Sequence, residues 1–299
     1  MHSHGCALSN CTACLSQSSK EQNTKLEPQA LVKELAKAFE AQQLIVHYQP
    51  KYSLQDESLI CVEALVRWQH PLHGLLLPEQ FLQLMQQQGL MPRLDQYVWR
   101  KACAQLQQWH QQGNNNLQLS LNVSPQSLEY YTLPKLFAEL AQEYAIKPEQ
   151  LHLEISESFY LQNPTKAIAV LAALRKAGFI MDDFGTGYSS FTMLSQLPLD
   201  VLNLDTAFVH AETAKPYDTS LLNEIINIAH RLDLSVVAGG VETREQMKRL
   251  RVMACEYTQG FFFAKPMPVA ELDQLLQTQR VHKPRLLSGF FPKANLIAS

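Results

Sequence analysis

Short apolar runs alternate along the chain with stretches in which apolar residues recur every three or four positions. The short runs predict buried strands, and the longer period predicts helices. Strands are predicted at residues 44–52 and 59–68 and in the runs that begin at Leu117, Leu151, Phe179, Val201, Ser235 and Tyr257. Helices are predicted at residues 31–43, 78–88, 93–112, 133–144, 164–176, 190–196, 219–232 and 244–251, with a last helix after Pro268.

Eight strands with intervening helices over about 240 residues are typical of a TIM-like (β/α)8 barrel rather than of two separate domains. The alternative is a doubly wound open sheet, but no glycine-rich phosphate-binding turn follows the first strand. We therefore expect one α/β barrel domain at residues 29–280, preceded by a flexible, cysteine-containing leader at 1–28 and followed by a tail at 281–299.

The run that begins at Phe179 ends in two adjacent carboxylates, Asp182 and Asp183, before Gly185 and Gly187. Alone, this pattern is more typical of a solvated turn after a strand. Other predicted strands, however, also carry acids or amides near their ends: Glu63, Asn122, Glu154, Glu157, Asp205, Glu242 and Gln259. Because the carboxyl ends of barrel strands converge at one mouth, we expect these side chains to meet there.

Neighbouring carboxylates repel each other unless cations or hydrogen-bond donors compensate them. Carboxylate and amide oxygens suit Mg²⁺ or Mn²⁺, and the predicted ligands are Glu63, Asn122, Glu154, Asp182 and Asp183. A pair of such ions could activate water and stabilise charge on a phosphodiester. Arg67 lies on the same strand face as Glu63 and could hold a phosphate with its bidentate guanidinium.

Composition narrows the possible partners. The net charge of −3 and the pI near 6.4 disfavour nucleic acid and anionic membranes as partners. No apolar run approaches the ~18 residues of a membrane span, and the first residues lack the features of a signal peptide. We therefore expect a cytoplasmic protein, in which Cys61, Cys103 and Cys255 are reduced, buried thiols.

Three further cysteines, Cys6, Cys11 and Cys14, lie in the polar leader near His2 and His4. They could bind zinc or iron or sense redox state. Their spacing matches no strong metal-binding motif, so we favour incidental thiols in a flexible segment.

The segment Glu63-Ala64-Leu65-Val66-Arg67-Trp68 resembles the signature of the EAL family of bacterial cyclic di-GMP phosphodiesterases. Further blocks match the family in order: Tyr48-Gln49-Pro50, Leu121-Asn122-Val123-Ser124, Leu153-Glu154-Ile155-Ser156-Glu157-Ser158, Asp182-Asp183-Phe184-Gly185-Thr186-Gly187 and Gln259-Gly260-Phe261. The resemblance covers roughly residues 31–275 and implies a barrel whose first strand runs antiparallel.

The resemblance also implies roles for individual residues. The five predicted metal ligands match family ligands, with Asp183 bridging two ions, and Glu157 would anchor the loop at 184–190. The residues that would line the dinucleotide or water site are Gln49, Arg67, Asp205, Glu242 and Gln259.

Two positions depart from the family pattern. Asn203 stands where the family has a lysine that activates the attacking water, and Gly239 stands where it has a metal-binding glutamate. Asn203 keeps a hydrogen-bond donor but loses the cation and its proton chemistry, and Gly239 removes a carboxylate. Mg²⁺ or Mn²⁺ binding should therefore be weakened.

The leading hypothesis is a degenerate, stand-alone EAL-domain regulator in cyclic di-GMP signalling that binds the dinucleotide or a protein partner with little or no hydrolysis. One alternative is a slow metal-dependent phosphodiesterase that yields linear pGpG. Another is a nucleotide-independent module that acts on a transcription regulator. A homodimer is expected through the loop after Asp183 and the helix that follows, where Leu194, Leu197 and Leu199 offer apolar surface unless they pack on the barrel.

Overall fold

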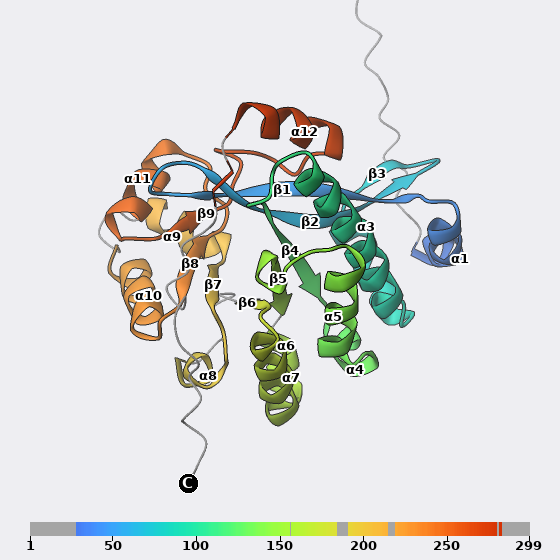
Figure 1. Ribbon diagram of the computed structural model, residues 1–299, viewed down its shortest axis with the longest axis horizontal. Helices are drawn as coiled ribbons and strands as arrows, with labels where there is room; N and C mark the ends of the chain where they lie inside the picture. Colours follow the sequence, from blue (N-terminus) through green and yellow to red (C-terminus); the bar gives the residue numbers. More distant parts are fainter. Residues whose placement is uncertain (1–27, 156, 184–190, 215–218, 280, 283–299) are drawn as a thin grey trace, which may run out of the picture.

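The computed structural model describes residues 28–155, 157–183, 191–214, 219–279 and 281–282. Among these residues, eight strands close a barrel (Figure 1). In spatial order they are β1 (Leu44–Ser53), β9 (Tyr257–Thr258), β8 (Ser235–Ala238), β7 (Val201–Leu204), β6 (Ile180–Asp183), β5 (Leu151–Ile155), β4 (Gln118–Val123) and β2 (Leu59–His70), and β2 pairs again with β1. The predicted barrel class is confirmed.

The first strand of the barrel runs against all the others. β1 pairs antiparallel with both β2 and β9, whereas the remaining barrel strands pair in parallel. The antiparallel first strand implied by the family resemblance is therefore confirmed. In the β1–β2 register Gln49 lies opposite Glu63 and Lys51 opposite Cys61, so the later residues of β1 lie deeper in the barrel, away from the strand ends that form the mouth.

Helices surround the barrel (Figure 1). Those that match predicted helices are α1 (Pro28–Glu40), α2 (Leu82–Gln87), α3 (Met91–Gln111), α5 (Leu133–Glu143), α7 (Pro164–Lys176), α8 (Phe191–Gln196), α10 (Thr219–Arg231), α11 (Arg244–Val252) and α12 (Val269–Thr278). The elements that were not predicted are short: β3 (Gly74–Leu76), α4 (Pro125–Tyr130), α6 (Glu157–Gln162), α9 (Thr206–Ala214) and the 3-10 turn η2 (Pro148–Gln150). A second 3-10 turn, η1 (Pro78–Gln80), forms the start of the helix predicted at 78–88.

Three predicted boundaries were wrong for local reasons. The helix predicted at 78–88 is divided into η1 and α2 at Phe81, whose side chain is fully buried. The first helix ends at Glu40 rather than at residue 43, because Gln42 takes a positive φ of 54° that turns the chain into β1. The apolar run at 257–263 forms a strand only as far as Thr258, because the chain turns at residues 261–263.

Apolar packing occurs in two separate clusters. The larger one joins the outer faces of the strands to the helices and includes the fully buried Trp68, Trp99 and Trp109. The smaller one contains only strand residues, Ile60, Cys61, Ile180, Val201, Val237 and Tyr257, and fills the barrel interior below the mouth. This filled interior leaves the polar residues together above it.

Several side-chain predictions can be checked against burial. Cys61, Cys103 and Cys255 are free and buried, as predicted. The leucines considered for a dimer surface, Leu194, Leu197 and Leu199, are buried in the main core, so they provide no exposed apolar face. They take the other role considered for them, which is packing on the barrel.

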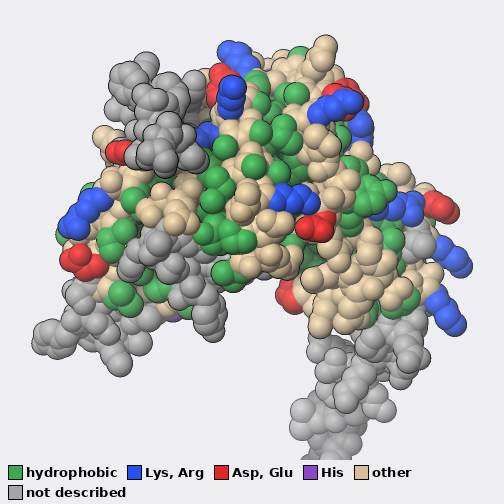
Figure 2. Space-filling model, turned by 90° about the horizontal axis from the view of Figure 1, so that it is seen from below, with side chains coloured by type: hydrophobic (Ala, Val, Ile, Leu, Met, Phe, Trp, Pro, Cys, Tyr) green, Lys and Arg blue, Asp and Glu red, His purple; other side chains and the backbone are tan. Residues whose placement is uncertain are grey.

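The surface carries charges of both signs. On the face seen in Figure 2, Lys and Arg side chains stand near Asp and Glu side chains and do not gather into one basic patch. None of the described helices has the length and apolar composition needed to cross a membrane.

Candidate functional site

Strand register brings the predicted polar residues to one level of the barrel. Asn122 on β4 lies opposite Glu154 on β5, and Glu154 lies opposite Asp182 on β6. Glu63 on β2 lies opposite Ser120, two residues before Asn122 on β4. Because side chains two residues apart share a strand face, these groups all point to the barrel interior. This register supports the predicted convergence for Glu63, Asn122, Glu154 and Asp182.

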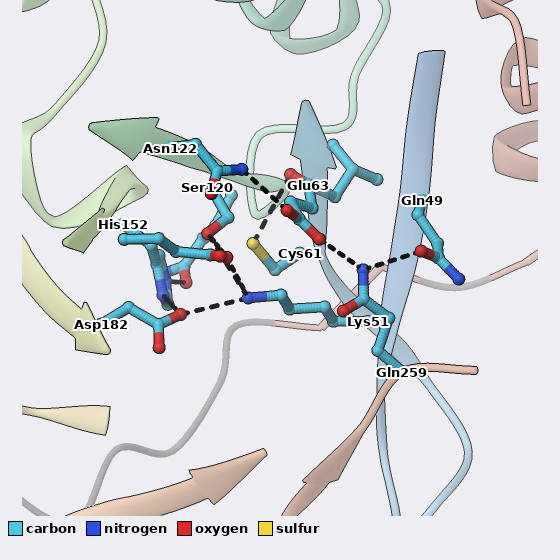
Figure 3. A network of polar contacts seen from close by, with 12 residues as sticks. Gln49, Lys51, Cys61, Glu63, Ser120, Asn122, His152, Asp182 and Gln259 are labelled. Carbon is cyan, nitrogen blue, oxygen red and sulfur yellow. Dashed lines mark hydrogen bonds and ion pairs between the residues drawn. The ribbon is translucent and has the colours of Figure 1, made fainter. Parts of the chain in front are cut away.

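Glu63 accepts hydrogen bonds from two side-chain amides, one on β4 and one just after β9 (Figure 3). Its Oε1 accepts a hydrogen bond of 2.8 Å from Asn122 Nδ2, and its Oε2 accepts one of 2.8 Å from Gln259 Nε2. The Gln259 amide also donates to Gln49 Oε1 at 3.3 Å, and Gln49 Nε2 donates to the Ala264 carbonyl at 3.2 Å. Both oxygens of this carboxylate therefore already have donors.

Glu154 and Asp182 share a lysine. Lys51 Nζ lies 2.7 Å from Glu154 Oε1 and 3.1 Å from Asp182 Oδ2, and it lies 3.4 Å from Ser120 Oγ (Figure 3). The Ser120 hydroxyl in turn donates to Glu154 Oε1. The Lys51 side chain is only 2% exposed, so this ammonium group is held inside the barrel rather than at its surface.

Burial and charge act in opposite directions on these groups. Burial disfavours the charged lysine, but the Asp182 and Glu154 carboxylates outweigh it and raise the pKa of Lys51 well above its ordinary value. Burial, reinforced by the Glu63 charge and opposed by Lys51, raises the pKa of Glu154 to about 7. For Asp182 the attraction of Lys51 and His152 outweighs burial and lowers the pKa. Lys51 is therefore the charged centre of the cluster.

Sequence reasoning missed Lys51, Ser120 and His152. His152 is buried, its Nε2 lies 2.5 Å from Gln118 Oε1, and burial lowers its pKa, which favours the neutral ring. A signal for these residues was present in the sequence. Lys51 stands two positions from Gln49, and His152 stands two positions before Glu154, so strand alternation places each on the same face as a predicted site residue.

The β7 and β8 side of the mouth has fewer partnered polar groups among the described residues. Asn203 Oδ1 is buried and has no hydrogen-bond partner among the described residues. At Gly239 a Cβ would lie 3.0 Å from the Leu204 carbonyl oxygen, to which Gly239 N donates at 2.9 Å, so this backbone contact leaves little room for a side chain. Gly240 is a glycine for a different reason, because its φ is 71° and a Cβ would lie 2.4 Å from Thr206.

Three predicted ligand-binding residues have hydrogen bonds or close contacts outside this network. Arg67 is 6% exposed, and its Nη1 donates to the Val66 carbonyl at 2.8 Å. Asp205 is exposed, and its Oδ1 accepts from Ala207 N at 2.7 Å at the start of α9. Glu242 is half exposed, with an oxygen 4.0 Å from His210 Nε2.

Other predictions fall outside the described parts of the chain. Asp183 is placed at the end of β6, but its side chain is not described, and the same holds for Glu157 at the start of α6. The loop at 184–190 and the leader with Cys6, Cys11 and Cys14 lie outside the described residues.

The described donors do not fit a two-metal centre. Both oxygens of Glu63 accept hydrogen bonds from amides, while Glu154 and Asp182 are paired with Lys51. Gly239 offers no ligand, and the described residues include no cluster of three or more His, Cys, Asp or Glu side chains arranged to hold a metal ion. Lys51 supplies positive charge directly beside Glu154 and Asp182.

Comparison with known proteins gives a consistent result. The sequence model of the EAL domain family matches residues 32–266 of this chain. Cyclic di-GMP phosphodiesterase NbdA of Pseudomonas aeruginosa is 38% identical over 249 residues, which is 83% of this chain and 32% of that protein. The bifunctional diguanylate cyclase/cyclic di-GMP phosphodiesterase MucR of the same species is 34% identical over 261 residues, which is 87% of this chain and 38% of that protein. The chain thus spans about a third of the length of these curated relatives.

Solved structures agree with the sequence comparison. The chain is similar to the PaMucR phosphodiesterase in complex with c-di-GMP, with a TM-score of 0.77 and 33% identity over 81% of this chain and 99% of that one. It shares its fold with the FimX EAL domain of Pseudomonas aeruginosa bound to c-di-GMP, with a TM-score of 0.72 and 21% identity over 79% of this chain and 96% of that one. Fold, motif order and family match lead to one conclusion: the chain belongs to the EAL-domain family and is homologous to cyclic di-GMP phosphodiesterases.

Proposed function

We propose that this EAL domain is a regulator that binds cyclic di-GMP with little or no hydrolysis. The observation that carries the proposal is the pair of departures from the family pattern at neighbouring places, Asn203 on β7 and Gly239 directly after β8. These are the positions at which the family pattern has a water-activating lysine and a metal-binding glutamate.

The changes affect the reaction more than the pocket. An asparagine amide can donate a hydrogen bond but cannot exchange a proton at neutral pH, and loss of a proton-transfer group commonly costs about 10²–10⁴-fold in rate. The loss of a metal ligand at Gly239 should lower turnover further, although effects within one catalytic unit need not add. The remaining mouth residues still form a connected, hydrogen-bonded pocket wall.

Nucleotide binding is supported by the residues that remain. Gln49, Arg67, Glu242 and Gln259 match family positions that line the dinucleotide site. A relative with 33% identity, the PaMucR phosphodiesterase, has been solved as a c-di-GMP complex. An Arg67 guanidinium can hold a phosphate with two parallel hydrogen bonds. We therefore assign cyclic di-GMP as the ligand of this chain.

A regulator that does not turn over its ligand must act through another molecule. We propose a protein partner, such as a transcription regulator, that recognises the ligand-bound barrel. A cytoplasmic location fits the three reduced, buried thiols at Cys61, Cys103 and Cys255. Homodimer formation remains a prediction of the family resemblance.

The test measures cyclic di-GMP binding and hydrolysis side by side. It compares the wild type with the double variant Asn203→Lys, Gly239→Glu, in buffer that contains Mg²⁺ or Mn²⁺. We expect both proteins to bind the dinucleotide and only the double variant to produce linear pGpG. Hydrolysis by the wild type at ordinary enzyme rates, about 1 s⁻¹ or faster, would contradict the proposal and favour a phosphodiesterase. Absence of binding in both proteins would favour a nucleotide-independent module.

A further inference from the structure

Lys51 enters the site from the strand that runs antiparallel to the others. It lies opposite Cys61, one inward-facing position deeper than the pair formed by Gln49 and Glu63. From there its side chain extends towards β5 and β6 (Figure 3). The long aliphatic part passes through the barrel interior, and only the ammonium group reaches the carboxylates.

The ammonium group has three oxygen neighbours. They are Glu154 Oε1 at 2.7 Å, Asp182 Oδ2 at 3.1 Å and Ser120 Oγ at 3.4 Å. An ammonium has three N–H donors, so each can be used. These neighbours come from β4, β5 and β6, and the lysine comes from β1. One cation therefore connects four strands of the barrel.

The two carboxylates are the ones that the family pattern assigns to metal. A divalent ion bound to the same oxygens would lie close to the ammonium, and repulsion between the two cations would weaken its binding. The carboxylate that Gly239 lacks would have opposed this repulsion. Lys51 and Gly239 thus act in the same direction, against a bound metal.

We propose that Lys51 is a built-in cation that takes the place of a divalent ion at Glu154 and Asp182. It compensates the charge of the two carboxylates and fixes their side chains, so that the barrel mouth is assembled without metal. Lys51 is a positioning residue in this account. The inference concerns the cation at the site and does not depend on whether a nucleotide binds.

An ordinary structural ion pair is the simpler interpretation, and it makes a different prediction. If Lys51 only stabilises the fold, its removal should lower stability in a way that metal does not restore. If Lys51 replaces a metal, its removal should create a metal site, because the carboxylates remain and the competing cation is gone. Metal binding and metal rescue separate the two interpretations.

The experiment uses Mn²⁺ alone, without nucleotide, and the full chain. Free Mn²⁺ is measured by electron paramagnetic resonance during titration of the wild type, Lys51→Met and Lys166→Met. The last variant is the matched control, because it removes a lysine whose ion pair with Glu129, at 3.6 Å, is largely exposed. We expect Lys51→Met to bind Mn²⁺ at least about tenfold more tightly than the wild type and the control to bind it as the wild type does.

Thermal unfolding provides the second measurement. Mn²⁺ should raise the Tm of Lys51→Met and leave the Tm of the wild type and of Lys166→Met nearly unchanged. Failure of Mn²⁺ to raise the Tm of folded Lys51→Met would overturn the proposal. Tight, stoichiometric Mn²⁺ binding by the wild type would overturn it as well, and that result can be obtained even if Lys51→Met does not fold.

Discussion

The two sides of the barrel mouth differ in how their polar groups are partnered. On β2, β4, β5 and β6, the carboxylate of Glu63 accepts hydrogen bonds from two amides, and Lys51 is shared by two further carboxylates. On β7 and β8, Asn203 has an amide oxygen without a partner among the described residues, and Gly239 has no side chain. The comparison shows that the polar groups of one side are hydrogen-bonded and ion-paired, whereas the other side offers a partnerless amide oxygen among the described residues and a glycine.

The largest expected change in stability is on the side of the mouth formed by β2, β4, β5 and β6. Lys51→Met leaves two neighbouring carboxylates without their cation, so it should lower the free energy of unfolding by about 3–5 kcal/mol. Urea unfolding would measure this change. The control Lys166→Met should cost at most about 1 kcal/mol, because its ion pair is largely exposed to water. If both variants lowered the free energy of unfolding equally, the buried Lys51 cluster would stabilise the fold no more than an exposed ion pair does.

A smaller effect is expected on ligand affinity. Arg67→Met should weaken cyclic di-GMP binding by about 1.5–3 kcal/mol, because it removes a charged donor for phosphate. Calorimetry would measure it. Arg251→Met is the control, since Arg251 forms an exposed ion pair with Glu57, at 3.0 Å, away from the mouth. If both variants bound alike, Arg67 would not contact the ligand.

On the β7 and β8 side, Gly239 lies close to the Leu204 carbonyl oxygen, to which its N–H donates. In Gly239→Ala the new Cβ would lie 3.0 Å from the Leu204 carbonyl oxygen. This contact is crowded, so we expect the free energy of unfolding to fall by about 1 kcal/mol. Chemical unfolding would detect it. If Gly239→Ala were more stable than the wild type, β7 would have to shift at little cost to make room for the methyl group. The space at Gly239 would then not distinguish the two sides of the mouth.

The smallest effect is expected at Asn203. Asn203→Leu removes a buried oxygen that has no partner among the described residues, so stability should stay unchanged or rise by up to about 1 kcal/mol. The matched control is Gln259→Leu on the ordered side. Gln259 donates to Glu63 and Gln49, and its loss should cost about 1–2 kcal/mol. If unfolding measurements showed a larger loss of stability for Asn203→Leu than for Gln259→Leu, they would contradict the contrast between the two sides.

The sequence predicts the barrel because its strands repeat one pattern. Each strand is a short apolar run, and the parallel connections each contain a helix with its own period. The antiparallel direction of β1 came only from the family resemblance, because strand periodicity carries no direction. The helices α4, α6 and α9 were missed because each begins two residues after a strand ends, so no loop of turn residues separates the two patterns.

The site was only partly predictable for a similar reason. Motif order located the acids and the two changed positions at residues 203 and 239. The pairing of Lys51 with Glu154 and Asp182 depends on the register of β1 against β2 and on the closure of the barrel. Both are tertiary features that separate partners by about a hundred residues in the chain. Strand alternation indicates which face Lys51 occupies, but not which carboxylates it meets.

The central claim is that the site binds its ligand and leaves it intact. The most direct measurement is calorimetric titration of the wild type with cyclic di-GMP, once in EDTA and once in Mn²⁺, followed by chromatography of the recovered nucleotide. The account predicts the same dissociation constant in both buffers and recovery of unchanged cyclic di-GMP. Binding that requires Mn²⁺, or conversion to linear pGpG, would contradict it.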